Sequence, residues 1–176
     1  MGMNGFISKH ELSNRVIELA EGLSRWVEVK KNNTPMKVFL EPMAKEFPPT
    51  RAHSTDAGLD LYCIDDTVVP ARGSAVFRTG VHIELPPNTY GKLESKSGLN
   101  ISKDIVSLGG VIDEGFSGEI LVKLYNMGDK DYKFKRGQKI VQLLVVQCQY
   151  VDVEVVDELF VGGERGSSGF GSSDRQ

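Results

Sequence analysis

Short β-forming runs, separated by prolines and glycines, constrain the fold of this chain more than any other feature. They occupy residues 36–40, 58–63, 75–77, 81–85, 91–93, 119–126, 140–146 and 151–156. Proline and glycine favour turns between strands rather than strand interiors. No helical period recurs in this region. The spacing therefore predicts an all-β fold: a sandwich, a jelly roll or a distorted barrel.

The N-terminal segment has a different pattern, which predicts an additional amphipathic α-helix. Ser8 and Glu11 have the spacing of a capping box, in which each side chain bonds a backbone N–H at the helix start. Apolar residues then recur at helical intervals: Leu12, Val16, Leu19, Leu23 and Trp26. This stripe must pack on the body of the chain or on a protein partner, and the sequence leaves both open. Residues 1–34 are thus predicted to be a helix and linker, ahead of a β domain over residues 35–161.

The last segment, residues 162–176, is predicted to be a flexible arm. Its stretch 165–173 holds three glycines and four serines, and so has too little apolar surface to order itself by burial. It also holds one guanidinium, Arg165, and one aromatic ring, Phe170, among glycines that let backbone amides approach a ligand. Together these groups suit a clamp for an anion and a ring.

Composition excludes several classes of protein. The 176 residues favour a single domain, and 21 basic against 24 acidic residues leave no basic block for a nucleic-acid surface. Cys63, Cys148 and the three scattered histidines have no metal-ligand spacing, which predicts no metal held by protein ligands. The apolar run 140–148 is shorter than the roughly 20 residues that span a bilayer. We expect a soluble cytoplasmic protein without a nucleic-acid or membrane partner.

One carboxylate stands where a catalytic group is expected. Asp113 follows Val111 and Ile112 in a short apolar run bounded by glycines. A strand or hairpin arm there would carry this carboxylate to the edge of a pocket, where it can act as a general base. The alternative is a turn aspartate that bonds its own backbone.

Three further polar groups are candidates for ligand binding. Lys96 and Ser97 lie in a short stretch with a cation, two hydroxyls and a glycine, which suits a phosphate cradle but is also ordinary loop composition. Asp60 lies between two leucines, so a strand would turn it away from them, by default toward solvent. Gln142 lies inside an apolar strand and is either a satisfied core amide or a ligand contact.

Five segments, taken in order, resemble the five motifs of the trimeric dUTP pyrophosphatase (dUTPase) family. They are residues 57–61, 96–99, 110–118, 136–143 and 165–173. The resemblance covers about residues 36–173, and the chain is identified as a member of this family, with a phage or prophage source as one option.

The resemblance implies a jelly-roll subunit of a homotrimer whose active sites are shared between chains, with each C-terminal arm reaching a neighbour's site. The implied reaction is hydrolysis of dUTP to dUMP and pyrophosphate, which keeps uracil out of DNA and supplies dUMP for thymidylate synthesis. Asp113 would orient and activate the water that attacks the α-phosphorus, and Asp60 would support it through water or Lys96. Mg²⁺ is implied as a cofactor bound through the triphosphate oxygens and water.

The resemblance also implies the residues that contact the substrate. They are Lys96, Ser97, Gly98, Gly110, Phe116, Gln142, Arg165, Phe170, Gly171 and Ser172. Within this set Phe116 would stack on the deoxyribose and exclude a 2'-hydroxyl, and Phe170 would cover the uracil. The backbone of residues 105–110 would read the base.

Four positions depart from the pattern. Lys96 stands where the family usually has an arginine, and Phe116 where it has a tyrosine. Gln138 and Lys139 replace an aspartate and an arginine of the fourth motif.

Two other functions are weighed against hydrolysis of dUTP. The related dCTP deaminase needs a glutamate general base where this chain has Lys123, and a lysine cannot perform that role. A nucleotide-gated interaction protein is the second alternative, in which the helix from Ser8 engages a partner.

Overall fold

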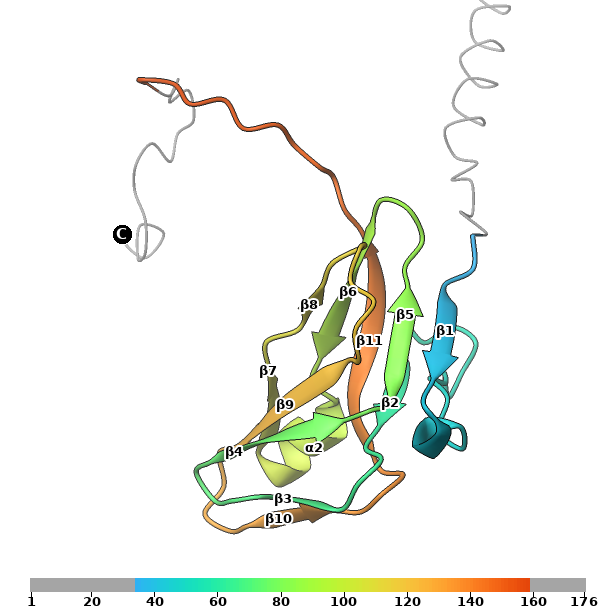
Figure 1. The fold of residues 1–176 in the computed structure, drawn as a ribbon. Coiled ribbons are helices and arrows are strands. Elements are labelled where there is room, and N and C mark those ends of the chain that lie inside the picture. The colour runs from blue at the N-terminus through green and yellow to red at the C-terminus, as the bar shows by residue number, and fades with distance from the viewer. Residues whose placement is uncertain (1–33, 159–176) are drawn as a thin grey trace, which may run out of the picture.

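The structure is a computed structural model that describes residues 34–158. The predicted N-terminal helix and the predicted C-terminal arm, with Arg165, Phe170, Gly171 and Ser172, lie outside these residues. The described region is mostly β-sheet (Figure 1), as the sequence predicted. The strands are β1 (Lys37–Leu40), β2 (Leu59–Tyr62), β3 (Thr67–Val69), β4 (Ser74–Arg78), β5 (Val81–Glu84), β6 (Thr89–Glu94), β7 (Ile105–Leu108), β8 (Val111–Ile112), β9 (Leu121–Asn126), β10 (Tyr132–Phe134) and β11 (Lys139–Gln147).

The strands pair antiparallel in four sheets. A four-stranded sheet has the order β2-β11-β6-β8, and a three-stranded sheet has the order β4-β9-β7. Two further pairs, β1-β5 and β10-β3, extend these layers. The longest strand, β11, pairs with β2 on one edge and β6 on the other. β11 therefore sets the register of β2, which carries Asp60, and of β6, which leads to Lys96.

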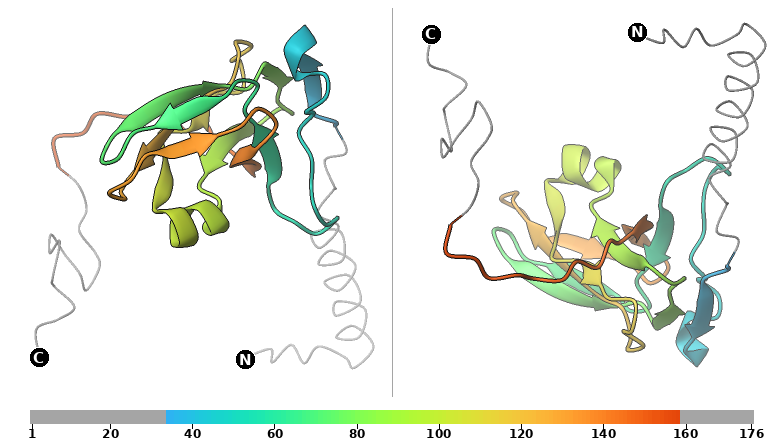
Figure 2. Two further views of the ribbon diagram at one scale, coloured as in Figure 1. Left: turned by 90° about the horizontal axis from the view of Figure 1, so that it is seen from below. Right: turned by 90° about the horizontal axis from the view of Figure 1, so that it is seen from above.

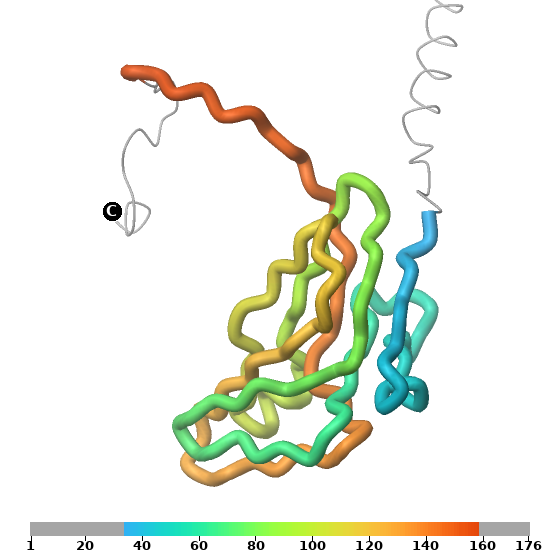
Figure 3. Tube along the Cα trace, in the orientation of Figure 1, coloured from blue at the N-terminus to red at the C-terminus, as the bar shows by residue number. Residues whose placement is uncertain are grey.

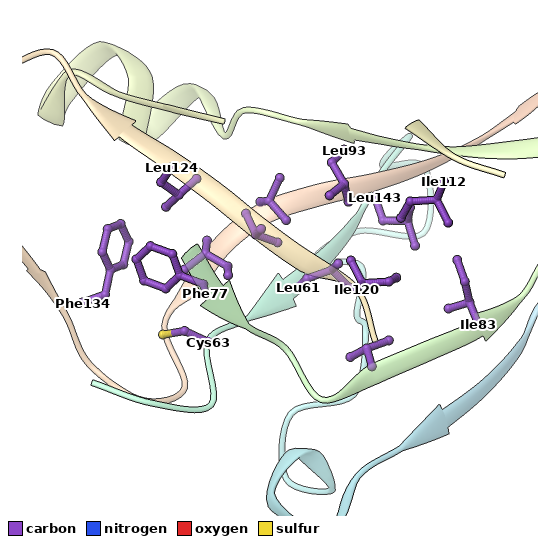
Figure 4. Packing of buried hydrophobic residues seen from close by; sticks show 14 of the residues in the cluster. Leu61, Cys63, Phe77, Ile83, Leu93, Ile112, Ile120, Leu124, Phe134 and Leu143 are labelled. Carbon is purple, nitrogen blue, oxygen red and sulfur yellow. The ribbon is translucent and has the colours of Figure 1, made fainter. Parts of the chain in front are cut away.

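The core lies between the two larger sheets. On β9 exposed and buried residues alternate, and Val122 and Leu124 point inward, because successive side chains of a strand face opposite sides. Phe77 and Phe134 meet edge to face at 5.1 Å between ring centroids, at one end of the cluster in Figure 4. Ile112 lies toward the other end, where β8 begins the candidate site.

One helix interrupts the β-structure of the described region, and the sequence did not predict it. It is α2 (Ser97–Lys103), which projects from one side of the body (Figure 2). Seven residues are too few to show a helical period, and none of them is buried. The helix ends at Asp104, whose φ of 54° is left-handed and whose N–H donates to the carbonyl of Asn100. A single 3-10 turn, η1 (Pro42–Ala44), follows β1.

The strand predicted over residues 151–156 is wrong in this structure. This segment is exposed, forms no sheet pairing and leaves the body after β11 (Figure 3). Alternating valines and acidic residues produced the strand pattern, but no edge of the described sheets lies beside it. The sequence also missed β3 and β10, because three-residue strands with polar members have no clear period.

Among the described residues, no helix has the length and apolar character needed to cross a membrane.

Leu143 lies in the middle of β11 and is fully buried, whereas Val145 on the same strand is 37% exposed. We expect Leu143→Ala to lower the free energy of unfolding by about 2–5 kcal/mol, because it leaves a cavity beneath the strand that joins two motif segments. The matched change Val145→Ala should cost less than about 1 kcal/mol. Urea unfolding followed by circular dichroism measures both, and equal losses would contradict the central place of β11.

Candidate active site

Asp113 directly follows β8, in a segment where β7 and β8 follow each other but form no hairpin, because β7 pairs with β9 and β8 pairs with β6. Gly109 and Gly110 join the two strands, with φ of 80° and 132°. The N–H of Leu93 on β6 donates to the carbonyl of Gly110 at 2.7 Å. A Cβ at Gly110 would lie 2.7 Å from the Cβ of Leu93, so only glycine allows this approach. The turn between β7 and β8 is thereby fastened to β6, and Asp113 has a defined position.

The turn after Asp113 closes on itself and is held by its neighbours. The N–H of Phe116 donates to the carbonyl of Asp113 at 3.0 Å. Glu114 Oε2 accepts from the N–H of Asn88 at 2.9 Å and from the Tyr150 hydroxyl at 2.6 Å. The hydrogen bond to Glu114 raises the pKa of Tyr150 to about 12. Asp113 thus sits on an anchored turn.

The other end of the turn is held by Glu119. Its Oε1 accepts from the N–H of Gly80 at 2.8 Å, and its Oε2 accepts from Nε of Arg78 at 3.1 Å. Glu119 therefore connects the turn to β4 and to the start of β5.

A pocket of about 270 Å³ lies between β8, the turn that follows Asp113 and the start of β9. Its lining residues are Leu93, Gly110, Val111, Ile112, Asp113, Phe116, Glu119, Ile120 and Leu121. Three predicted site residues, Gly110, Asp113 and Phe116, thus come together. The Phe116 ring is 43% exposed, and it packs so closely on Gly118 that a Cβ there would lie 2.7 Å from it. The pocket offers a carboxylate and an aromatic ring to one ligand.

A second cluster surrounds Asp60, and here the default expectation of a solvent-facing residue is wrong. Asp60 is buried, 8% exposed, on a strand that pairs with β11 on one side and bridges to Thr50 on the other. Lys96 Nζ donates to its Oδ1, and Lys139 Nζ lies 2.6 Å from its Oδ2. Desolvation by burial favours the neutral carboxyl, but the hydrogen bonds from Lys139 and Lys96 outweigh it and hold the pKa of Asp60 below its ordinary value.

Gln142 lies on β11. It is opposite Asp60 of β2 on one side and opposite Glu94 of β6 on the other. Its Nε2 donates to the carbonyl of Ser95 at 3.1 Å, so the amide is satisfied within the chain. Its Oε1 occupies space that a Cβ at Gly58 would fill at 2.7 Å.

Lys96 and Ser97 stand at the start of α2. Lys96 is the N-cap residue, and Ser97 and Gly98 are the first two helical residues. No atom lies within 4 Å of the place where a Cβ of Gly98 would be, so this turn borders open space. The Ser95 hydroxyl accepts from the N–H of Ser107 at 2.9 Å, which ties this segment to β7.

No residue of the Asp60 cluster lines the pocket of Asp113. Ile112, the residue before Asp113, lies opposite Gly91 on β6, whereas Ser97 follows the far end of that strand. Six residues from Gly91 to Ser97 correspond to roughly 15–20 Å along an extended chain. One chain therefore brings Gly110, Asp113 and Phe116 to one place, and Asp60, Lys96, Ser97, Gly98 and Gln142 to another.

Sequence reasoning did not assign a contact to Lys139, which it noted only as a departure from the family pattern. The sole signal was a cation at the start of an apolar strand. Its contact with Asp60 depends on the register of β11 against β2, which includes a bulge between Lys139 and Val141. Glu114 and Glu119 were also missed, because carboxylates flanking a glycine-rich turn are ordinary surface residues.

Within residues 34–158, no group of three or more histidine, cysteine or acidic side chains is arranged to hold a metal ion.

The fold and the two clusters define a β-sheet domain with a pocket that presents a carboxylate and an aromatic ring. Comparison with known proteins identifies the family. The dUTPase family model matches residues 46–174, and the chain belongs to the dUTPase family of nucleotide hydrolases.

Relatives agree with this assignment. Deoxyuridine 5'-triphosphate nucleotidohydrolase of Gloeothece citriformis is 44% identical over 127 residues, which cover 71% of this chain and 87% of the relative. The structure of the Staphylococcus bacteriophage 80alpha dUTPase with dUPNHPP matches with a TM-score of 0.74 and 27% identity, over 80% of this chain and 99% of that one.

A third likeness extends to the fold alone. It is a mutant dUTPase from phage phi11 of S. aureus, solved with a structural Mg(II) ion. The TM-score is 0.66 at 24% identity, over 71% of this chain and 98% of that one.

We expect Asp60→Asn to lower the free energy of unfolding by about 2–3 kcal/mol at neutral pH, because it leaves two lysines without their shared carboxylate. The pKa of Asp60 is lowered in the folded protein from its ordinary value of 3.8. Its stabilisation is therefore complete above that value and is lost as the pH falls through the folded pKa. Urea unfolding at several pH values should show the two proteins converging in acid.

Asp129→Asn is the matched control, because Asp129 pairs with Arg72 while 83% exposed. It should cost less than about 1 kcal/mol at any pH. A pH-independent difference between wild type and Asp60→Asn would contradict the charge interaction.

Proposed function

We propose that this chain hydrolyses dUTP to dUMP and pyrophosphate. The observation that carries the proposal is the position of Asp113 in the pocket beside Phe116, directly after β8 in a dUTPase family member. The reaction removes a precursor of uracil in DNA and supplies dUMP for thymidylate synthesis. We place it in the cytoplasm of a bacterial or phage-infected cell, where deoxynucleotides are consumed.

Asp113 is the proposed general base. Its carboxylate accepts a proton from a water molecule, whose oxygen forms a bond to the α-phosphorus while the bond to the bridging oxygen breaks. Pyrophosphate leaves on the opposite side. The anchored turn supports this role because phosphoryl chemistry depends on holding water and phosphorus in line.

The pocket is the proposed site for the nucleoside. The ring of Phe116 stacks on the deoxyribose, where a 2'-hydroxyl would collide with it. The backbone near Gly110 contacts the uracil edge. Because Phe116 lacks the hydroxyl of a tyrosine, this contact relies on packing alone.

The Asp60 cluster is the proposed site for the phosphates. Lys96 and Ser97 supply a cation and a hydroxyl beside the open start of α2, and Gln142 contacts the phosphates or their water molecules. Gly98 leaves room for their approach. Asp60 acts at one remove, by holding Lys96.

Mg²⁺ is the proposed cofactor, carried on the nucleotide. When bound, Mg²⁺ neutralises charge on the triphosphate oxygens.

A homotrimer with shared sites is the proposed assembly. The separation of Asp113 from Ser97 along β6 supports it, because a trimer could bring Asp113 of one chain to Ser97 of another. The exposed segment 150–158 leads away from the body, and the arm beyond it would bring Arg165, Phe170, Gly171 and Ser172 to a neighbour's site. Arm closure would exclude bulk water and strengthen the electrostatic interactions inside.

We expect Asp113→Asn to lower kcat for dUTP by about 10²–10⁴-fold, because the amide cannot accept the proton of water. Pyrophosphate release is measured with Mg²⁺ for dUTP, dCTP, dTTP and UTP. The wild type should act on dUTP far faster than on the others, and chelation of Mg²⁺ should suppress release. Asp129→Asn should leave the rate unchanged. Release from no nucleotide by the wild type would refute the proposed reaction.

Mixing two inactive variants tests the shared site. Asp113→Asn and Ser97→Ala damage different clusters, so trimers re-formed from an equal mixture should hold about a quarter of their sites intact. Activity should then exceed that of either variant alone. Activity that stays at the level of the separate variants, although native mass spectrometry with one variant isotope-labelled shows mixed trimers, would place both groups in one chain's site.

A further inference from the structure

His82 on β5 has an acceptor beside each of its ring nitrogens. Nδ1 lies 2.9 Å from the carbonyl oxygen of Ser117, and Nε2 lies 3.4 Å from Oε1 of Glu41. A backbone carbonyl and an ionised carboxylate only accept hydrogen bonds, whereas a neutral imidazole carries a single N–H. Only the protonated ring can donate to both partners.

The surroundings of His82 favour its protonated form. The charged groups that face the ring from the packed elements are Glu41, Arg78, Glu119 and, along the β1-β5 pair, Lys37 and Glu84. Arg78 opposes a second cation, but its guanidinium is already shared by Glu41 at 2.5 Å and Glu119 at 3.1 Å. Lys37 is likewise paired with Glu84 at 2.7 Å. The carboxylates therefore outnumber the cations around the ring.

The ring is also held mechanically. Phe39 on β1 packs against it at 5.4 Å between centroids, with the planes at 65°. The side chain of His82 is 24% exposed. The imidazole is confined between β1 and the turn that follows Asp113. Its hydrogen bond to Ser117 therefore holds this turn in a fixed position relative to β5.

That hydrogen bond acts next to the substrate pocket. Ser117 directly follows Phe116, whose ring lines the pocket, and precedes Gly118, on which that ring packs. Holding the carbonyl of Ser117 thus restricts the backbone on one side of the aromatic residue.

We propose that His82 is a positioning residue for sugar selectivity: its imidazolium holds the Ser117 carbonyl, fixes the Phe116 ring, and so strengthens discrimination of deoxyribose from ribose. The inference rests on the proposed function, because it assigns the sugar to Phe116. Neither the reaction itself nor the family pattern requires a histidine at this position.

The direction of the pH effect follows from the contacts. The hydrogen bond to Ser117 raises the pKa of His82 above its ordinary value, burial opposes this, and the Glu41 carboxylate adds to it. A raised pKa means that both contacts of the charged ring are complete below the ordinary value of 6.5. As the pH rises through the folded value, the donor to Glu41 is lost, and the bond to Ser117 becomes the weaker one of a neutral Nδ1–H. Selectivity should therefore decline as the solution becomes alkaline.

The test compares kcat/KM for dUTP and UTP from about pH 5.5 to pH 8.5, the range around the histidine pKa. The wild-type preference for dUTP should fall about fivefold across this range, the size expected when a charge-assisted hydrogen bond is replaced by a neutral one. His82→Leu removes both donors and should show a preference below that of the wild type at every pH. His82→Gln keeps an N–H for Ser117 without titrating, so its preference should be higher than that of His82→Leu and independent of pH.

His53→Gln is the matched control, because His53 lies in an exposed turn where it pairs with Asp56. It should preserve the wild-type profile. A purely structural role of His82 would lower the melting temperature of His82→Leu without changing the dUTP to UTP ratio of the folded enzyme, and that result would overturn the inference. Failure of the wild type to hydrolyse dUTP would instead overturn the proposed function.

An activity-independent readout tests the contact itself. Histidine resonances of the full chain, titrated without nucleotide, should include one with a pKa above 6.5 that disappears in His82→Gln. Glu41→Gln should lower that pKa, because it replaces a facing carboxylate by a neutral amide. A His82 resonance with a pKa at or below 6.5 would refute the double-donor arrangement, whatever the enzyme's activity.

Discussion

The pairing of β11 with both β2 and β6 is the constraint on which the candidate site depends. Gln142 lies opposite Asp60 on one neighbour and Glu94 on the other, so one strand aligns two segments that are far apart in sequence. The approach to Lys96 and Ser97 follows directly from Glu94. A slip of one residue would exchange the faces of the strand and expose Leu143 while burying the polar side. The buried apolar face of β11 thus fixes where Lys96 meets Asp60.

How far the sequence predicts this structure depends on how local each feature is. Runs with β-branched and apolar residues, such as β9 and β11, were predicted because alternation and burial are visible in a few residues. Helix α2 was not predicted, because seven exposed residues have no period. The opposite error occurred at residues 151–156, where Val151, Val153 and Val155 alternate with polar residues but no strand edge lies beside them. A strand pattern in the sequence shows that a segment could pair in a sheet. A strand forms only where the edge of another strand is available to pair with it.

The candidate site shows the same division. Motif order identified Asp113 and Phe116, and the structure brings both to one pocket. Alternation correctly turned Asp60 away from its leucines, but nothing local revealed that the facing surface is covered. The contacts of Lys139 and His82 come from segments far apart in sequence, so they depend on strand register and could not be inferred from spacing. The pocket of the proposed base contains none of the residues of the proposed phosphate cluster, and the proposed trimer would bring the two together across chains.

The carboxylate of Asp60 is shared by two lysines, Lys96 and Lys139. An arginine fork can engage both oxygens of a carboxylate at once, whereas a lysine ammonium is a point charge that binds one. Here Lys96 takes Oδ1 and Lys139 takes Oδ2, so each cation uses one oxygen. Each ammonium has three donors and so keeps two for other acceptors. Two cations on one carboxylate leave a net positive charge beside Ser97, which suits the proposed phosphate site. The point charge of Lys96 would by itself hold a ligand loosely, but its anchor on a buried carboxylate limits its freedom.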